Sequence, residues 1–335
     1  MHARIPALFL LPAMLLAGCV QQYSQDKAIE HYVEGQLLAE EGEYRAALAE
    51  LSRAVAYDPR LSAAHTAAGD IYRREANYSL AARAYERACE ANPYAFRAHY
   101  NLGVTYQLMA SEGTELDEEL LRRAVNVFIR AGEIQAGDFD TNLNLSACYF
   151  QLGKFSLAET YCLAAVEARP DSAEAFSNLG AIYDSQNRLY DAIRSYKTSL
   201  ELQADQPNLL MNLGATYVRQ KRYGDALRTY ERATTNMPDS GKVWEQIGLC
   251  QYQLGRHAEA MQSYVRAAEL DPRSAQAHRG VGIVCMSRYV LDRSRRDLHS
   301  RAIQAWHRSL ELEPDQRDLR ELLRKYAMPQ HEPQL

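Results

Sequence analysis

The sequence predicts an all-α solenoid of eight stacked helix–turn–helix units, with one further helix at its C-terminal end. The first observation is a series of small residues that recurs every 34 residues, with a single step of 43. A series of alanines runs in register with it, with steps of 34 apart from one of 43 and one of 42. A fixed period of this size is typical of solenoids, in which each unit buries its apolar face against its neighbours. The two series are Gly35, Gly69, Gly103, Ser146, Gly180, Gly214, Gly248 and Gly282, and Ala47, Ala81, Ala124, Ala158, Ala192, Ala226, Ala260 and Ala302.

The N-terminal segment has the organisation of a targeting signal rather than of a folded unit. His2 and Arg4 precede an apolar stretch over residues 5–17, which is too short to be a stable membrane-spanning helix. The stretch ends in Leu-Ala-Gly-Cys at positions 16–19. These four residues resemble the lipobox of bacterial lipoproteins, which implies a signal peptide over residues 1–18 and lipid attachment to Cys19 as the mature N-terminus.

The resemblance to lipoproteins also has consequences for location. Val20, and not an aspartate, follows Cys19; in Gram-negative lipoproteins this implies transport to the outer membrane, so that the chain faces the periplasm. Diacyl and N-acyl chains together supply more than one membrane signal, which is enough for stable anchoring. Residues 19–27 are expected to form a short lipid-anchored linker of at most about 3.3 Å per residue, so the first unit is expected to lie close to the membrane.

We number each unit so that Gly35 is position 8. The sequence of each unit then predicts two helices joined by a tight turn. In the first helix, tyrosines such as Tyr72 and Tyr217 follow the small residue at a spacing of three, which gives one apolar helical face. In the second helix, a bulky residue such as Tyr85 or Trp306 follows the alanine at a spacing of four. Proline closes six units, where it ends one helix and begins the next. The predicted units are 28–61, 62–95, 96–138, 139–172, 173–206, 207–240, 241–274 and 275–316.

Together these positions resemble the tetratricopeptide repeat. That repeat has a bulky residue at position 4, Leu at 7, Gly at 8, Tyr at 11, Ala at 20 and 27, an aromatic at 24 and Pro at 32. The resemblance covers residues 28–316 and implies a right-handed α–α superhelix whose first helices line a concave surface. Ser146 in place of glycine, and Ser199 and Ser309 in place of alanine, are interpreted as tolerated variants.

Two units carry insertions, and both fall between the two helices of their unit. The third unit has nine additional residues around 111–119, where Thr114 and Asp117 resemble a capping box that starts the second helix early. The eighth unit has eight additional residues around 288–301. We interpret the insertions as lengthened, solvated second helices; the alternative is one acidic and one basic contact on the same edge of the solenoid.

The C-terminal end of the array is expected to carry a shielding helix over residues 317–327. Leu319, Leu322 and Leu323 fall on one face of this segment, and charged residues occupy the rest. A terminal helix with a polar outer face covers the last unit of a solenoid and keeps it soluble. Residues 328–335 are predicted to be a frayed tail.

The resemblance places positions 2, 5, 6, 9, 12 and 13 of the first helices on the concave surface. Position 6 carries a carboxamide in five units, and a carboxamide both donates and accepts, as a peptide backbone requires. This resembles the asparagine ladder of O-GlcNAc transferase and implies a groove that binds an extended peptide; the alternative is that asparagine is simply common there. The candidate groove residues are Asn101, Asn144, Asn178, Asn212 and Gln246 at position 6, Tyr100, Leu143 and Met211 at position 5, and Phe150 and Tyr252 at position 12.

Several classes of function are disfavoured. The net charge of −5 and the absence of a basic run along the units argue against nucleic acid binding. No HExxH, phosphate-loop or G-x-S-x-G element is present, so we expect neither an enzyme nor a cofactor. His65, His99 and His278 occupy position 4, a packing position, which argues against a metal site. The five cysteines beyond Cys19 read as small core residues.

We interpret the chain as a lipid-anchored, periplasm-facing scaffold that binds a protein or extended peptide in its groove and assists assembly of a cell-envelope complex. It resembles the type IV pilus pilotin lipoproteins, which are short tetratricopeptide arrays behind a lipobox and help an outer-membrane secretin assemble. The Lys and Asn with which chaperone-binding members clamp a terminal carboxylate are missing from positions 5 and 9. Alternatives are an adaptor or regulator of peptidoglycan synthases or hydrolases, and a carbohydrate-binding envelope subunit.

Overall fold

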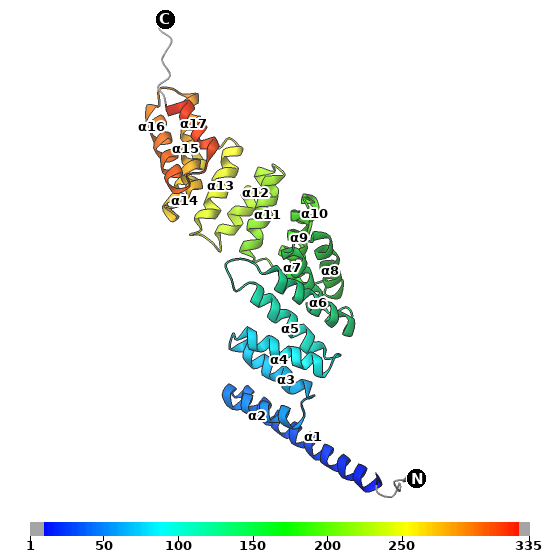
Figure 1. Cartoon of the computed structure of the whole chain (residues 1–335). Helices are drawn as coiled ribbons and strands as arrows, with labels where there is room; N and C mark the ends of the chain where they lie inside the picture. The colour runs from blue at the N-terminus through cyan, green and yellow to red at the C-terminus, as the bar shows by residue number, and fades with distance from the viewer. Residues whose placement is uncertain (1–9, 328–335) are drawn as a thin grey trace, which may run out of the picture. The chain divides into compact units, whose positions relative to one another are not determined.

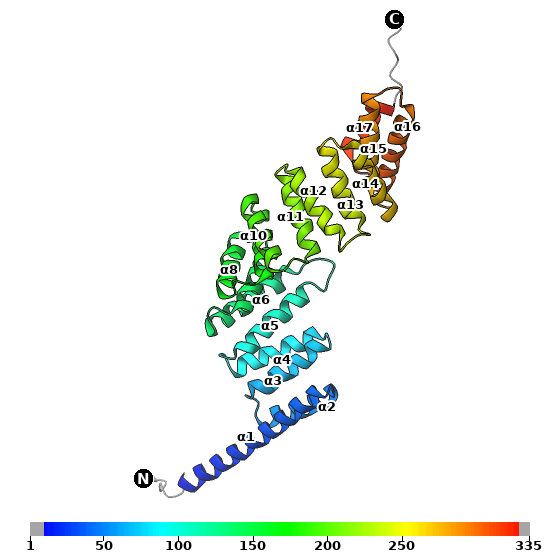
Figure 2. The same cartoon turned by 180° about the vertical axis from the view of Figure 1, so that it is seen from behind.

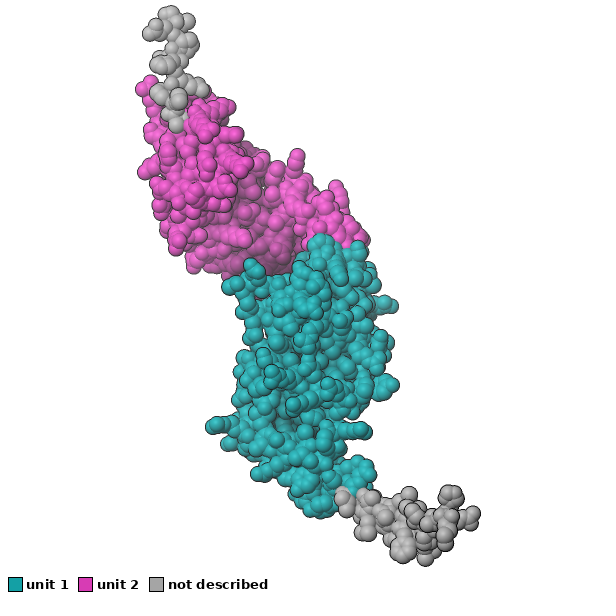
Figure 3. Space-filling model, viewed as in Figure 1, with its two compact units in different colours: residues 1–170 teal, residues 171–335 magenta. Residues whose placement is uncertain are grey.

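The computed structural model describes residues 10–327, with side chains from residue 21 onward, and all regular structure in this part is helical. The chain divides into two compact units, Met1–Pro170 and Asp171–Leu335 (Figure 3). The first unit contains α1 (Leu10–Glu40), α2 (Tyr44–Tyr57), α3 (Ser62–Arg74), α4 (Tyr78–Ala91), α5 (Phe96–Ala110), α6 (Glu118–Ile134), α7 (Phe139–Gln151) and α8 (Phe155–Ala168). The second contains α9 (Ala173–Ser185), α10 (Leu189–Leu202), α11 (Pro207–Arg219), α12 (Tyr223–Thr234), α13 (Gly241–Gln253), α14 (His257–Leu270), α15 (Ala275–Leu291), α16 (Arg296–Leu312) and α17 (Arg317–Ala327).

The helices pair in chain order, α1 with α2, α3 with α4, and so on to α15 with α16. Figures 1 and 2 show these hairpins stacked side by side within each unit. Within a unit, each second helix also packs against the first helix of the next hairpin. This arrangement is a tetratricopeptide-type solenoid, so the predicted fold class is confirmed.

Close contact between the small residue of the first helix and the bulky residue of the second explains the 34-residue period. At Gly180, an added Cβ would lie 2.4 Å from the Tyr196 ring, and at Gly282 it would lie 2.2 Å from the Trp306 ring. Separations this short are sterically forbidden, so only glycine lets the two helices approach. The same relation joins Gly35 to Leu51, Gly69 to Tyr85, Gly103 to Phe128 and Gly214 to Tyr230, at 2.5–2.9 Å. The contact of Gly248 with Tyr264 is looser, at 3.0 Å.

In one hairpin the glycine is replaced by Ser146, and the bulky residue that faces it is also replaced. The position that elsewhere holds a bulky side chain is Cys162, which is fully buried. The smaller side chain leaves room for the serine Cβ, and Ser146 Oγ donates a hydrogen bond to the Ala158 carbonyl at 2.9 Å. The serine is therefore accommodated by a matched change in the facing helix.

A second recurring contact ties position 4 to the preceding loop. The Nε2 atoms of His65, His99 and His278 lie 3.1–3.2 Å from the carbonyl oxygens of the prolines six residues before them. Trp244 uses its Nε1 in the same way on Pro238, at 2.9 Å. These rings thus satisfy loop carbonyls at the junction between hairpins. Among the described residues, no group of three or more His, Cys, Asp or Glu is placed to hold a metal ion.

The two insertions take different forms. In the first, residues 111–117 form an exposed loop, and Asp117 caps α6 by accepting from the backbone N–H groups of Glu119 and Leu120. Thr114 is not the capping residue, contrary to the predicted capping box, because the helix begins at Glu118. In the second, both α15 and α16 are 17 residues long, so the insertion lengthens the first helix as well as the second.

The helix α17 covers the apolar end of the last hairpin. Leu319 and Leu323 join a buried cluster that includes Trp306. The Tyr326 ring packs at a tilt on Trp306 at a centroid separation of 6.3 Å, and the Tyr326 carbonyl lies 2.8 Å from His299 Nε2. The predicted tail over 328–335 lies outside the described residues.

At the N-terminal end, α1 includes residues 19–27, which the sequence predicts as a linker. Residues 1–9 of the predicted signal peptide and the side chain of Cys19 lie outside what the structure describes. None of the helices described between residues 10 and 327 is both long and apolar enough to cross a membrane.

The cysteines of the repeats lie mostly in the core. Cys148, Cys162, Cys250 and Cys285 are buried and Cys89 is half-buried, and no disulfide joins these five described side chains. Burial raises the pKa of the Cys148 thiol to about 12. Such thiols behave as small apolar residues rather than as reactive groups.

Candidate functional site on the first helices

The first helices of neighbouring hairpins contact one another within each unit: α1 with α3, α3 with α5 and α5 with α7 in the first, and α9 with α11 and α13 with α15 in the second. In the first unit they therefore form a continuous layer. In the second they form two contacting pairs, α9 with α11 and α13 with α15, and α12 packs against both α11 and α13. The candidate groove residues all lie on these first helices. Their surroundings, however, differ from one hairpin to the next.

Asn101 is not available to a ligand, contrary to the expectation that every rung of the ladder is exposed. Its side chain is buried, with 7% of its surface exposed. The Nδ2 group donates to Asp70 Oδ1 at 2.9 Å. The reason is that position 9 of the preceding hairpin carries an aspartate, which holds the carboxamide inside the fold.

Asn144 is half-buried, and its amide group is also engaged. Its Nδ2 lies 2.8 Å from the Asp140 carbonyl and 3.2 Å from the Tyr100 hydroxyl. These two bonds use both N–H groups of the amide and leave its oxygen as an acceptor. Asn144 can therefore accept a hydrogen bond from a ligand without rearrangement, but it cannot donate one.

The carboxamides of the second unit keep all of their hydrogen-bond donors and acceptors available. Asn212 is exposed, and Asn178 and Gln246 are half-buried. The side chains of these three residues make no hydrogen bond to any other residue that the structure describes. They lie on α9, α11 and α13, at the same position of three consecutive hairpins. Donors and acceptors for an extended backbone are thus concentrated on the second unit.

The apolar groove residues predicted at positions 5 and 12 are partly or fully buried. Leu143 is buried, whereas Tyr100, Phe150, Met211 and Tyr252 are half-buried. Tyr100 stacks on Phe96 with ring centroids 6.0 Å apart, and the Tyr252 hydroxyl lies 2.9 Å from Ser287 Oγ. Only the outer parts of these side chains can contact a ligand.

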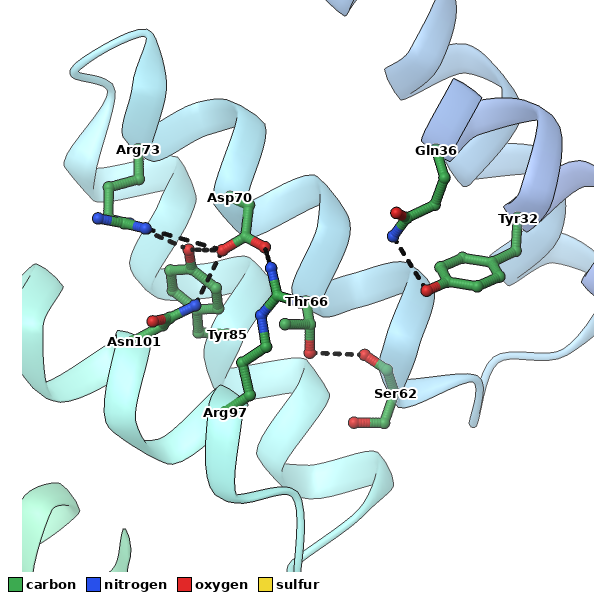
Figure 4. A network of polar contacts seen from close by, with 9 residues as sticks. All are labelled: Tyr32, Gln36, Ser62, Thr66, Asp70, Arg73, Tyr85, Arg97 and Asn101. Atoms are coloured by element: carbon green, nitrogen blue, oxygen red, sulfur yellow. Dashed lines mark hydrogen bonds and ion pairs between the residues drawn. The ribbon is translucent and has the colours of Figure 1, made fainter. Parts of the chain in front are cut away.

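A polar network on the first unit was not predicted from the sequence (Figure 4). Asp70 Oδ1 accepts from the Tyr85 hydroxyl at 2.6 Å and from Asn101, and Asp70 Oδ2 accepts from Arg97 Nη2 at 2.6 Å. Arg73 stands behind the same carboxylate, with 4.0 Å between Nη2 and Oδ1. Burial and the neighbouring carboxylate raise the pKa of the Tyr85 hydroxyl, so this group stays a proton donor to Asp70.

This network borders a pocket of about 320 Å³ between α1, α3 and the start of α5. One signal in the sequence marks it, because Asp70 is the only charged residue among the eight found at position 9. The lining residues are Tyr32, Gln36, Ser62, Ala63, Thr66, Ala67, Asp70, Asn92, Ala95, Phe96, Arg97 and Ala98. A second pocket, of about 280 Å³, lies at the turn between α6 and α7 and is lined by this turn and by residues of α6, α7 and α8.

Comparison with known sequences supports the nature of the repeats. Family models described as tetratricopeptide repeat match residues 139–172, 171–239 and 211–275, and one described as TPR repeat matches residues 69–109. No curated protein matches the chain.

Solved structures with a similar fold include YrrB, described as a TPR protein with an unusual peptide-binding site. It has a TM-score of 0.51 and 20% identity, and the match covers 60% of this chain and 99% of that one. A tetratricopeptide repeat protein from Parabacteroides merdae has a TM-score of 0.54 and 15% identity, over 80% and 99% of the two chains. Pseudomonas aeruginosa pilF has a TM-score of 0.52 and 17% identity, over 64% and 94%. At these identities the likeness concerns the fold.

Proposed function

We propose that the chain, which carries tetratricopeptide repeats, is a lipid-anchored envelope scaffold that binds an extended segment of a partner protein. The site is the surface of the first helices in the second unit. Asn178, Asn212 and Gln246 hold the partner there through its backbone.

The observation that carries this proposal is the set of three carboxamides that have no hydrogen-bond partner among the described residues. Each offers two N–H donors and an acceptor oxygen, which match the alternating C=O and N–H groups of an extended chain. Such contacts hold a backbone without reading its sequence. The adjoining half-buried Met211 and Tyr252 supply apolar contact for the side chains of the bound segment.

Site-specific photo-crosslinking in the native host tests this site. A photoreactive phenylalanine analogue in place of Asn212 is expected to crosslink to a discrete protein, because the position faces the partner. The same analogue at Lys197, an exposed position on the second helix α10, is the matched control and is expected to give no such product. Alanine at Asn178 and Gln246 should weaken the Asn212 crosslink. Equal crosslinking from both faces would contradict the proposal.

The lipid anchor is the second part of the proposal, and it rests on the four residues at 16–19. Eight residues, 20–27, lie between Cys19 and Ala28, the first residue of α1 whose side chain the structure describes as buried, and all eight are helical, so the span is nine helical steps. A helix rises about 1.5 Å per residue, so the spacer extends only about 14 Å, less than half the reach of an extended linker. The anchor would thus hold the first hairpin close to the periplasmic surface of the outer membrane.

Replacing Cys19 by alanine is expected to abolish lipidation and leave either an unprocessed precursor or a soluble product. The wild-type chain should incorporate labelled palmitate and sediment with outer-membrane markers in a sucrose gradient. Alanine at Cys89, which is half-buried and far along the sequence, should leave both properties unchanged. Normal fractionation and an unchanged mature mass for the Cys19 variant would rule out the anchor.

For the pathway, we propose assistance to a cell-envelope assembly such as type IV pilus or secretin biogenesis. The support is the combination of a lipobox with tetratricopeptide repeats, as in the pilotin lipoproteins. Deletion of the gene should then reduce heat-stable secretin multimers in the outer membrane. Unchanged multimers together with altered peptidoglycan crosslinking would favour the alternative, an adaptor of peptidoglycan synthases or hydrolases; retention on immobilised glycans would favour a carbohydrate-binding subunit.

A further inference from the structure

The pocket beside Asp70 on the first unit has more hydrogen-bond donors than acceptors. Arg97 carries five N–H groups, and Asp70 engages one of them, while 72% of the Arg97 side chain is exposed. The Tyr32 hydroxyl accepts from Gln36 Nε2 at 2.9 Å, and its own proton has no acceptor among the described residues. Asn92 Oδ1 accepts a hydrogen bond from the Tyr94 N–H, and both N–H groups of the Asn92 amide are available to a ligand.

The charged acceptor of the same pocket, the Asp70 carboxylate, is largely engaged. Asp70 receives three hydrogen bonds in addition to its ion pair with Arg73. The hydroxyl protons of Ser62 and Thr66 are already donated to the backbone carbonyls of Ala88 and Ser62, at 2.8 and 2.9 Å. Their oxygens remain acceptors, as does the amide oxygen of Gln36. The N–H and O–H groups left on Arg97, Tyr32 and Asn92 outnumber these acceptors, so the pocket favours a ligand that brings acceptors of its own.

The charges favour the same class of ligand. Arg97 and Asp70 are the two charged residues that line the pocket, and their charges balance. Arg73, which does not line the pocket, also pairs with Asp70, so the three groups together carry one net positive charge. Charge-assisted hydrogen bonds from arginine to a carboxylate are about twice as strong as neutral ones, so an anionic acceptor is preferred over a neutral one.

The size and lining of the pocket suit a ligand no larger than an amino-acid side chain. A volume of about 320 Å³ lies at the lower end of ligand pockets, too small for a large cofactor. Ala63, Ala67 and Phe96 form an apolar wall beside the donors, against which the methylene groups of a glutamate can pack. The pocket lies among the first helices of the first unit, α1, α3 and α5.

We propose that this pocket binds a glutamate or aspartate side chain of the partner protein, with Arg97 as its main donor. The inference rests on the proposed function, because it names the chemistry of the partner at a second point on the first helices. It requires neither a terminal carboxylate nor the lysine and asparagine that a clamp for such a terminus uses.

The test uses the full chain in detergent and a library of N-acetylated, C-amidated nonapeptides, which lack terminal charges. Peptides retained by the wild-type chain are sequenced, and one is resynthesised with its acidic residue and with the matching amide. We expect acidic residues to be enriched, and the change from Glu to Gln to weaken binding about 10- to 100-fold, as measured by fluorescence anisotropy.

Three variants assign the effect to the pocket. Arg97→Gln should remove most of the difference between the Glu and Gln peptides. Arg53→Gln is the matched control, because Arg53 is also exposed and also makes one ion pair, 2.6 Å from Glu50 on α2, and it should preserve the difference. Asp70→Asn should strengthen binding of the Glu peptide, because it removes the competing carboxylate. Circular dichroism melts verify that each variant is folded.

The possible failures are distinguishable. Selected peptides without enriched acidic residues, or a Glu-to-Gln ratio that Arg97→Gln leaves unchanged, would overturn this inference while the groove of the second unit still stands. Displacement of the peptide by inorganic phosphate at the same concentration as by acetyl-glutamate amide would show a general anion site and also overturn it. Retention of no peptide at all, with no crosslink from Asn212, would remove both proposals.

Discussion

Replacing Tyr196 by cysteine is expected to lower the local free energy of unfolding of α9 and α10 by about 3–5 kcal/mol, the range found when a large buried aromatic is removed. Replacing Gly180 by serine is expected to cost about 1–3 kcal/mol, as overpacking of a well-packed contact does. The combination of the two should cost less than their sum, by about 1–3 kcal/mol, because each change relieves the defect that the other creates.

The reason lies in the hairpin of α7 and α8, where the chain already carries this combination. Ser146 and Cys162 occupy there the positions that Gly180 and Tyr196 occupy in α9 and α10. Tyr196 is 2% exposed and lies where a Cβ at position 180 would be. With cysteine at 196, a serine at 180 has room, and its hydroxyl can donate to the Ala192 carbonyl as Ser146 donates to Ala158.

Amide hydrogen exchange of α9 and α10 measures these changes, because solenoids open locally and a local probe reports the hairpin in question. Gly224→Ser is the control, since a Cβ at Gly224 on α12 meets no atom within 4 Å. That substitution should be neutral or slightly stabilising. Strict additivity of the Gly180 and Tyr196 changes would mean that the Ser146–Cys162 pair is coincidental rather than a matched solution.

The repeat positions made the helical hairpins predictable, because a period of 34 residues encodes the packing contact itself. Gly180 and Tyr196 are sixteen residues apart in the sequence, and their pairing recurs in each hairpin where both types occur. The exception at Ser146 is visible in the sequence, but the sequence alone does not connect it to Cys162. That connection depends on which side chain faces the serine Cβ, and this is known only once the two helices are placed against each other.

The site was predicted less completely, because position in a repeat does not determine exposure. Asn101 and Asn212 occupy the same position, yet the first is buried and the second is exposed. The difference arises from position 9 of the preceding hairpin, which is Asp70 for Asn101 and Ala181 for Asn212. An aspartate there captures the carboxamide, whereas an alanine cannot. The groove is therefore decided by pairs of positions from neighbouring hairpins.

The same reasoning predicts the behaviour of the ladder on the second unit. Changing Asn178, Asn212 and Gln246 together to alanine should leave thermal stability nearly unchanged, because the three side chains have no partner inside the described fold. Each hydrogen bond to a peptide backbone contributes about 0.5–1.5 kcal/mol. Their joint loss should weaken partner binding by about 2–4 kcal/mol, a factor of tens to several hundred.

Titration of the crosslinked partner, or of a peptide selected by the wild-type chain, measures this loss. Gln262→Ala and Gln304→Ala are the matched controls, because they remove exposed carboxamides from the second helices α14 and α16 of the same unit. These controls should bind as the wild type does. Asn101→Ala should behave oppositely to the ladder variant, with lower stability and unchanged binding, since its amide donates to Asp70. If the triple variant keeps full affinity, the carboxamides are a feature of the repeat rather than the means by which it holds a partner.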